Sequence, residues 1–157
     1  MTRIRSALTL AAGALVAVGI AFAAQAEEIM GDHYVDKLKY SNHGSYNSAV
    51  ELHYKNPGSD HSSSIDCASL KGEHNACLMS QNQNTIIDIG RSIEDDKKVA
   101  EGAQVWLIVY IGSGPTQSCH KENAKFYYQS GSNTTAKFST AGTTQNRNRC
   151  TYDGLTH

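Results

Sequence analysis

Histidine beside a carboxylate is the combination in this sequence that could perform acid–base or metal chemistry. It occurs at Asp32-His33, at Asp60-His61 and at His120-x-Glu122. A carboxylate that orients an imidazole supports metal ligation and general-base catalysis, but only when folding adds further ligands or a nucleophile. No two histidines have the spacing of a tight ligand pair. The other histidines of the chain are His43, His53, His74 and the terminal His157. We expect all of them to be solvated loop and strand-face residues.

The four cysteines are Cys67, Cys77, Cys119 and Cys150. Their spacing does not match the C-x₂₋₄-C pairs of a zinc site, and an even number of cysteines in an exported chain predicts two disulfides. Sequence permits three pairings. The shorter loops favour local pairing, with Cys67 joined to Cys77 across a hairpin at Leu70 to Asn75, and Cys119 joined to Cys150.

Other catalytic motifs are missing from the sequence. The segment Gly112-Ser113-Gly114 lacks the spacing and the strand-to-helix elbow of a nucleophilic serine, and oxidised thiols would not attack a substrate. No glycine-rich phosphate loop precedes a helix. The acidic run Glu94-Asp95-Asp96 is predicted to be a solvated loop. A calcium site is the alternative, although the spacing of these residues does not match an EF-hand. We therefore expect no enzymatic activity, no catalytic residue, no cofactor and no metal.

The first 26 residues have the layout of a cleaved signal peptide. Arg3 and Arg5 precede an uncharged run from Leu8 to Ala24, and Ala24-Gln25-Ala26 is a small-x-small cleavage site. An uncleaved membrane anchor is the alternative, because the run approaches the roughly 20 residues that span a bilayer. We expect residues 27–157 to form one domain that is secreted or, in a bacterium, periplasmic, with no later transmembrane segment.

The charge of the chain argues against a nucleic-acid partner. The whole sequence has 14 Lys and Arg against 15 Asp and Glu, and loss of Arg3 and Arg5 leaves 12 against 15, a net charge of −3. A basic surface is what nucleic-acid binding requires. The locally basic tail from Lys121 onward is explained by a solvated strand face.

Apolar residues recur at every second position, which is typical of half-buried antiparallel strands. One predicted strand has an inner face made of Tyr46, Ser48, Val50, Leu52 and Tyr54. Its other face is polar apart from Ala49, and Asn56-Pro57-Gly58 ends it. In the preceding segment Tyr34, Leu38 and Tyr40 alternate with Val35, Lys37 and Lys39, and the turn residues 42–45 between the two segments predict a hairpin.

The segment Ala103 to Ile111 is apolar on both faces, which predicts a central strand. Trp106, Ile108 and Tyr110 share one of these faces. Burial of Trp106 in the core under a second sheet is the favoured interpretation. If that face is uncovered, it is an apolar patch for a glycan, protein or lipid partner. Tyr127 beside Lys125 poses the same question, so Trp106, Tyr110 and Tyr127 are the candidate binding residues.

Further short strands are predicted around residues 65–67, 77–79, 85–89, 124–128 and 134–140, and one near Cys150. Ile93 to Ala100 has too few apolar positions for a buried helix and is predicted to be a loop. Seven to nine short strands in about 130 residues predict an all-β, antiparallel two-sheet β-sandwich of immunoglobulin-like arrangement. A small closed β-barrel is the alternative.

No motif assigns the chain to a known family, so function is inferred from the fold class alone. The favoured hypothesis is a secreted, non-enzymatic, disulfide-stabilised binding module for an unidentified protein, glycan or lipid. The alternatives are a secreted hydrolase with a histidine–carboxylate site, a membrane-active toxin, and an enzyme inhibitor that presents Leu70 to Asn75.

Overall fold

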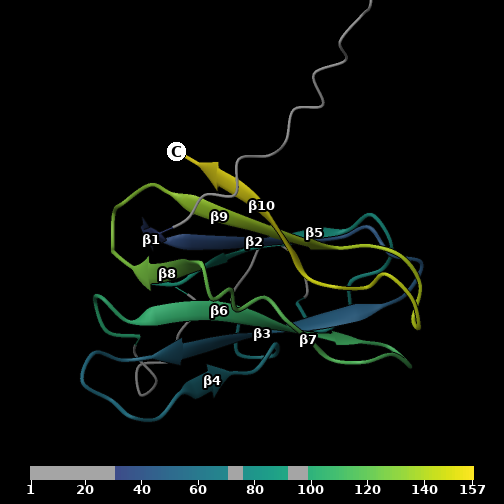
Figure 1. Cartoon of the computed structure of the whole chain (residues 1–157), viewed down its shortest axis with the longest axis horizontal. Helices are drawn as coiled ribbons and strands as arrows, with labels where there is room; N and C mark the ends of the chain where they lie inside the picture. The colour runs from purple at the N-terminus through teal and green to yellow at the C-terminus, as the bar shows by residue number, and fades with distance from the viewer. Residues whose placement is uncertain (1–30, 71–75, 92–98) are drawn as a thin grey trace, which may run out of the picture.

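The computed structural model describes residues 31–70, 76–91 and 99–157, which form two stacked β-sheets without a helix (Figure 1). The predicted signal peptide, most of the predicted inhibitor loop and the acidic run at 94–96 lie outside these residues. The two-sheet β-sandwich with two disulfides is confirmed, and the sheets do not close into a barrel. Nowhere in the described part of the chain does an apolar helix of membrane-spanning length occur.

One sheet has six strands in the order β1-β8-β6-β3-β4, with β7 also paired to β6. Its strands are β1 (Gly31–Val35), β3 (Ser48–Lys55), β4 (Ser63–Ile65), β6 (Gln104–Ile111), β7 (Gln117–Ser118) and β8 (Ala124–Tyr128). The predicted two-sided apolar strand is β6, and it lies inside the sheet as expected, between β3 on one side and β8 and β7 on the other.

The other sheet has four strands in the order β10-β9-β2-β5. Its strands are β2 (Lys37–Asn42), β5 (Asn84–Asp88), β9 (Thr135–Thr140) and β10 (Thr151–Thr156). Both sheets are mixed, because β1 pairs with β8 and β2 pairs with β9 in parallel. The alternation that predicted the strands does not reveal their directions, so these two parallel pairings were not expected.

The predicted hairpin between the segments at 34–40 and 46–54 is wrong. β2 and β3 lie in different sheets, and the turn at 42–45 carries the chain from one layer to the other. Both strands have a buried inner face, and these faces pack against each other across the sandwich instead of lying side by side. The hydroxyl of Tyr40 donates a hydrogen bond of 3.1 Å to Ser48 Oγ across the two layers.

The chain passes from one sheet to the other at Asp36, between β1 and β2. The predicted alternation, with Tyr34 on the same face as Leu38 and Val35 on the opposite face, is therefore wrong for Tyr34 and Val35. Tyr34 on β1 is 56% exposed, whereas Val35 is fully buried. The alternation observed in β2, where Leu38 and Tyr40 are buried, therefore does not continue back into β1. A single residue between two strands is enough to invert which side chains face the core, because the side-chain period of a strand is two.

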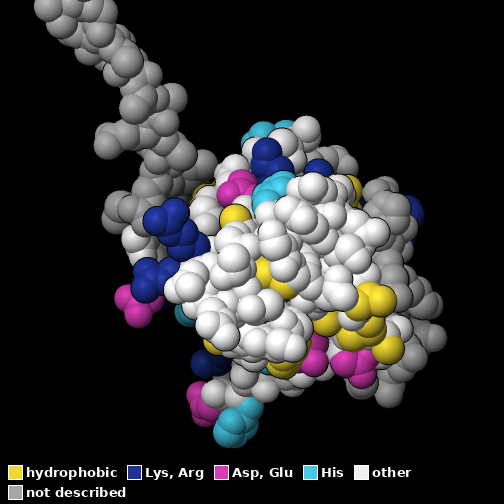
Figure 2. All heavy atoms as spheres, turned by 90° about the vertical axis from the view of Figure 1, so that its right-hand side faces the viewer, with side chains coloured by type: hydrophobic (Ala, Val, Ile, Leu, Met, Phe, Trp, Pro, Cys, Tyr) yellow, Lys and Arg dark blue, Asp and Glu magenta, His cyan; other side chains and the backbone are white. Residues whose placement is uncertain are grey.

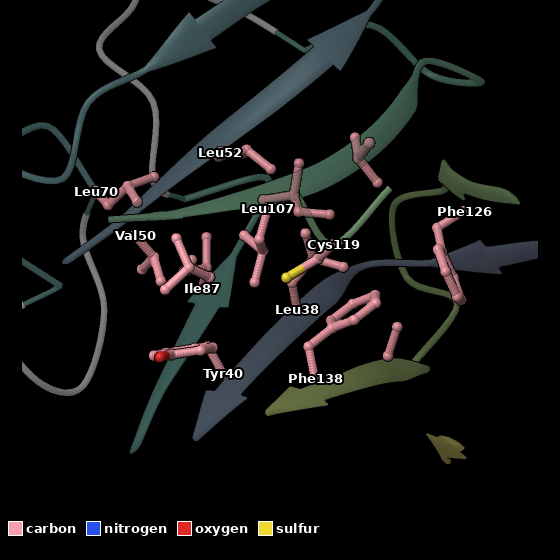
Figure 3. Close-up of a cluster of buried hydrophobic side chains, with 14 of the residues drawn as sticks. Leu38, Tyr40, Val50, Leu52, Leu70, Ile87, Leu107, Cys119, Phe126 and Phe138 are labelled. Atoms are coloured by element: carbon pink, nitrogen blue, oxygen red, sulfur yellow. The ribbon is translucent and has the colours of Figure 1, made fainter. Parts of the chain in front are cut away.

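The core fills the space between the inner faces of the two sheets (Figure 3). Leu38, Tyr40, Ile87 and Phe138 enter it from the four-stranded sheet. Val50, Leu52, Leu107 and Phe126 enter it from the six-stranded sheet. The alternation predicted for the strand at 46–54 is confirmed, since Ser48, Val50, Leu52 and Tyr54 are all buried.

Both predicted disulfides are confirmed, as Cys67–Cys77 and Cys119–Cys150. Cys119 and Cys150 are buried, and they join the segment after β7 in one sheet to the start of β10 in the other. In the chain-entropy description the two bridges contribute roughly 3 and about 3.7 kcal/mol by restricting the unfolded chain. Cys67 and Cys77 themselves lie in turns. The strand predicted around residues 65–67 is instead β4, which ends at Ile65. The strand predicted around residues 77–79 is only an isolated β-bridge between Met79 and Ser48.

Candidate functional site

The outer face of the six-stranded sheet carries the candidate binding residues. On β6 the residues Val105, Leu107 and Val109 point into the core, so Trp106, Ile108 and Tyr110 point outward. Trp106 is half-buried and Tyr110 is 40% exposed. The prediction that Trp106 belongs to the core is wrong, because the second sheet covers only the inner face of β6.

Two tyrosines extend this face toward the sheet edge. Tyr34 on β1 and Tyr127 on β8 are register partners, and their ring centroids lie 6.0 Å apart. Tyr127 is in turn the register partner of Gln104 on β6. Strand pairing therefore places Tyr127 on the same surface as Trp106, on the strand between Trp106 and the edge residue Tyr34.

Two histidines pack against the indole of Trp106. His53 on β3 is its register partner, with ring centroids 5.9 Å apart. His120 approaches the indole edge-on at 5.3 Å, and its Nε2 forms a hydrogen bond of 3.0 Å with the side-chain amide of Gln104. These contacts hold the indole between imidazoles on both sides and restrict its rotation.

Glu51 on β3 connects Tyr110 to the histidines. The Tyr110 hydroxyl donates a hydrogen bond of 2.8 Å to Glu51 Oε2, and His53 Nε2 lies 3.3 Å from the same oxygen. The hydrogen bond to Glu51 and, to a lesser degree, burial raise the pKa of the Tyr110 phenol above its ordinary value. The hydroxyl therefore stays protonated and fixed toward the carboxylate.

We call this surface the aromatic face. Its members are Tyr34, Glu51, His53, Gln104, Trp106, Tyr110, His120 and Tyr127. They lie on strands or, for His120, two residues after the end of β7. Sequence analysis identified three of them. Glu51 and His53 were missed because their place beside Trp106 and Tyr110 depends on the pairing of β3 with β6, which no local pattern reveals.

The structure does not assemble the histidine–carboxylate pairs that the sequence suggested. His33 stacks on Phe126 with centroids 5.6 Å apart, and its Nε2 is buried without a hydrogen-bond partner. His61 bonds through its backbone to Ser59, and His120 contacts Gln104 and Trp106. Within the described ranges no three His, Cys, Asp or Glu side chains come together as a metal-binding group. His74 lies outside these ranges.

The arrangement combines aromatic rings with hydrogen-bonding groups that a ligand can contact. His53 and Glu51 form a histidine–carboxylate pair, and the groups they contact are the Tyr110 phenol and the Trp106 indole. The face presents aromatic rings interleaved with hydrogen-bonding groups on rigid strands.

No protein-family model and no curated protein matches this chain. Solved structures of distantly similar shape include the human-specific toxin intermedilysin, with a TM-score of 0.40 and 14% identity over 74% of this chain. Pneumolysin gives 0.38 and 11% over 74% of this chain. The chain spans 22% and 23% of those two proteins. The membrane-binding domain of pneumolysin gives 0.34 and 10%, over 75% of this chain and 95% of that domain.

Proposed function

We propose that this protein is an exported, non-enzymatic binding module that recognises carbohydrate through the aromatic face. The observation that carries the proposal is the continuous contact from Tyr110 through Glu51 and His53 to Trp106. An aromatic ring offers an apolar surface on which the C–H face of a sugar ring can lie, and neighbouring polar groups can bond the sugar hydroxyls. Two disulfides are consistent with an oxidising compartment.

The polar content of the face favours a glycan over a protein partner. The centre of a protein interface is depleted of charged residues and packs densely. Here two imidazoles contact the single tryptophan and a carboxylate contacts one of these imidazoles, and all three polar groups are accessible or half-buried. Polar groups at this density are suited to a ligand that carries a hydroxyl on nearly every carbon.

The test is a glycan array probed with the disulfide-bonded protein and two matched variants. Glu51→Gln keeps the shape of the side chain and removes its charge. We expect it to weaken binding about tenfold, the loss typical of a charge-assisted hydrogen bond. Asp153→Asn makes the same chemical change on exposed β10 of the other sheet, and it should bind as the unmodified protein does.

A second arm of the experiment uses phosphatidylcholine–phosphatidylserine vesicles. It tests the membrane-active alternative, which the sequence left open. Absence of any retained glycan, or equal binding by both variants, would contradict the proposal. Vesicle binding that Glu51→Gln abolishes would assign the aromatic face to a lipid surface in its place.

A further inference from the structure

A hollow of about 610 Å³ lies on the other sheet, at the connection between β9 and β10. The residues that line it have polar side chains apart from one alanine, and they are Ser139, Ala141, Gln145, Asn146, Arg147, Asn148, Arg149 and Thr151. The volume falls within the range of about 300–1,000 Å³ that small-molecule sites occupy. The connection lies at the right-hand end of the sandwich in Figure 1.

The loop that forms the hollow is held in one shape. Thr143 N donates to Asn146 O over 2.9 Å. The side-chain amide of Asn148 donates to Thr143 O and Thr144 O over 3.2 and 2.9 Å, and this residue is only 6% exposed. The disulfide at Cys150 anchors the end of the loop. A ligand would therefore meet a preformed wall, which lowers the entropy lost on binding.

The backbone at Arg147 has the left-handed conformation, with φ of 57°. Residues other than glycine adopt this region at a cost, and such strain persists only where the surrounding contacts impose it. Here the strained residue is one of the two cations of the hollow.

The two guanidinium groups have no acidic counterpart in the lining. The ion pairs found among the described residues involve Lys37, His53 and Arg91, and neither Arg147 nor Arg149 takes part. Figure 2 shows this end of the molecule covered mainly by uncharged polar side chains and backbone. Guanidinium groups bond sulfate, phosphate and carboxylate oxygens through paired N–H donors.

We infer that this hollow is a second binding site, separate from the aromatic face, for a sugar that carries a sulfate or phosphate ester. Arg147 and Arg149 bind the ester oxygens. The amides and hydroxyls of Gln145, Asn146 and Ser139 bond the hydroxyls of the sugar, since seven of the eight residues that line the hollow have polar side chains. The inference does not depend on the aromatic face, because it rests on a different sheet and on different residues.

The test is NMR titration of the disulfide-bonded protein with glucose 6-sulfate, glucose 6-phosphate, inorganic phosphate and glucose. We expect saturable shifts of the backbone amides of residues 142–149 with both sugar esters, weaker shifts with inorganic phosphate, and none with glucose. The variant Arg147→Asn/Arg149→Gln should bind the esters at least about tenfold more weakly. Asparagine is chosen at 147 because it tolerates the left-handed region.

Arg91→Gln is the matched control, since its side chain is 87% exposed and lies outside the hollow. It should leave the ester affinities unchanged. If the shifts do not saturate by about 10 mM ester, the dissociation constant lies above the millimolar range, and the inference is overturned. The same affinity in the double variant with its fold intact would also overturn it. Equal affinity for inorganic phosphate and the sugar esters would overturn the sugar assignment.

Discussion

Phe138→Ala is expected to lower the free energy of unfolding by about 3–5 kcal/mol. Phe138 is fully buried on β9, and its ring packs edge-on against Phe126 of the opposite sheet at 5.3 Å. Truncation removes this contact between the two layers and leaves a cavity that the rigid strands cannot close. The variant should melt on the order of 10 °C or more below the unmodified protein.

Denaturant unfolding monitored by far-ultraviolet circular dichroism measures this change. Phe138→Leu retains most of the apolar volume and is the control, with an expected loss well below that of alanine. A loss under about 1 kcal/mol for Phe138→Ala, as expected of a surface substitution, would contradict the two-layer packing described here.

Trp106→Ala is expected to have the opposite outcome. Trp106 is half-buried on the outer face, so its removal should change the melting temperature far less than Phe138→Ala. Its removal also takes away the ring that both His53 and His120 contact, which is the largest ring of the aromatic face. We expect glycan affinity to fall by about 100-fold or more, as truncation of a central aromatic anchor does.

Calorimetry and glycan titration on the same preparation of Trp106→Ala measure the two effects. Trp106→Phe retains an aromatic ring and should recover part of the affinity. A melting temperature as low as that of Phe138→Ala, or unchanged affinity in Trp106→Ala, would contradict the placement of the site.

The sequence predicts this fold well wherever one strand face is buried. Alternation at Ser48, Val50, Leu52 and Tyr54 located β3 and its inner face, and the even cysteine count with short spacings located both disulfides. These features depend on local period and local loop length, which a single sequence contains.

Features that depend on long-range pairing were not predictable in the same way. Alternation cannot tell a hairpin from two strands that face each other across a sandwich, so it does not reveal that β2 and β3 lie in different sheets. A two-sided apolar strand such as β6 is equally compatible with a covered and an uncovered outer face, so its pattern does not reveal that Trp106 lies outside the core. The polar residues Glu51 and His53 gain a role only from their register with β6.

The intrinsic fluorescence of Trp106 tests the central claim most directly, because it is the single tryptophan of the chain. Acrylamide should quench its emission readily in the free protein, and a glycan selected from the array should shift the emission to shorter wavelength and reduce quenching in proportion to saturation. Emission that is already shielded from acrylamide in the free folded protein, or that does not respond to a bound glycan, would contradict a carbohydrate site built around Trp106.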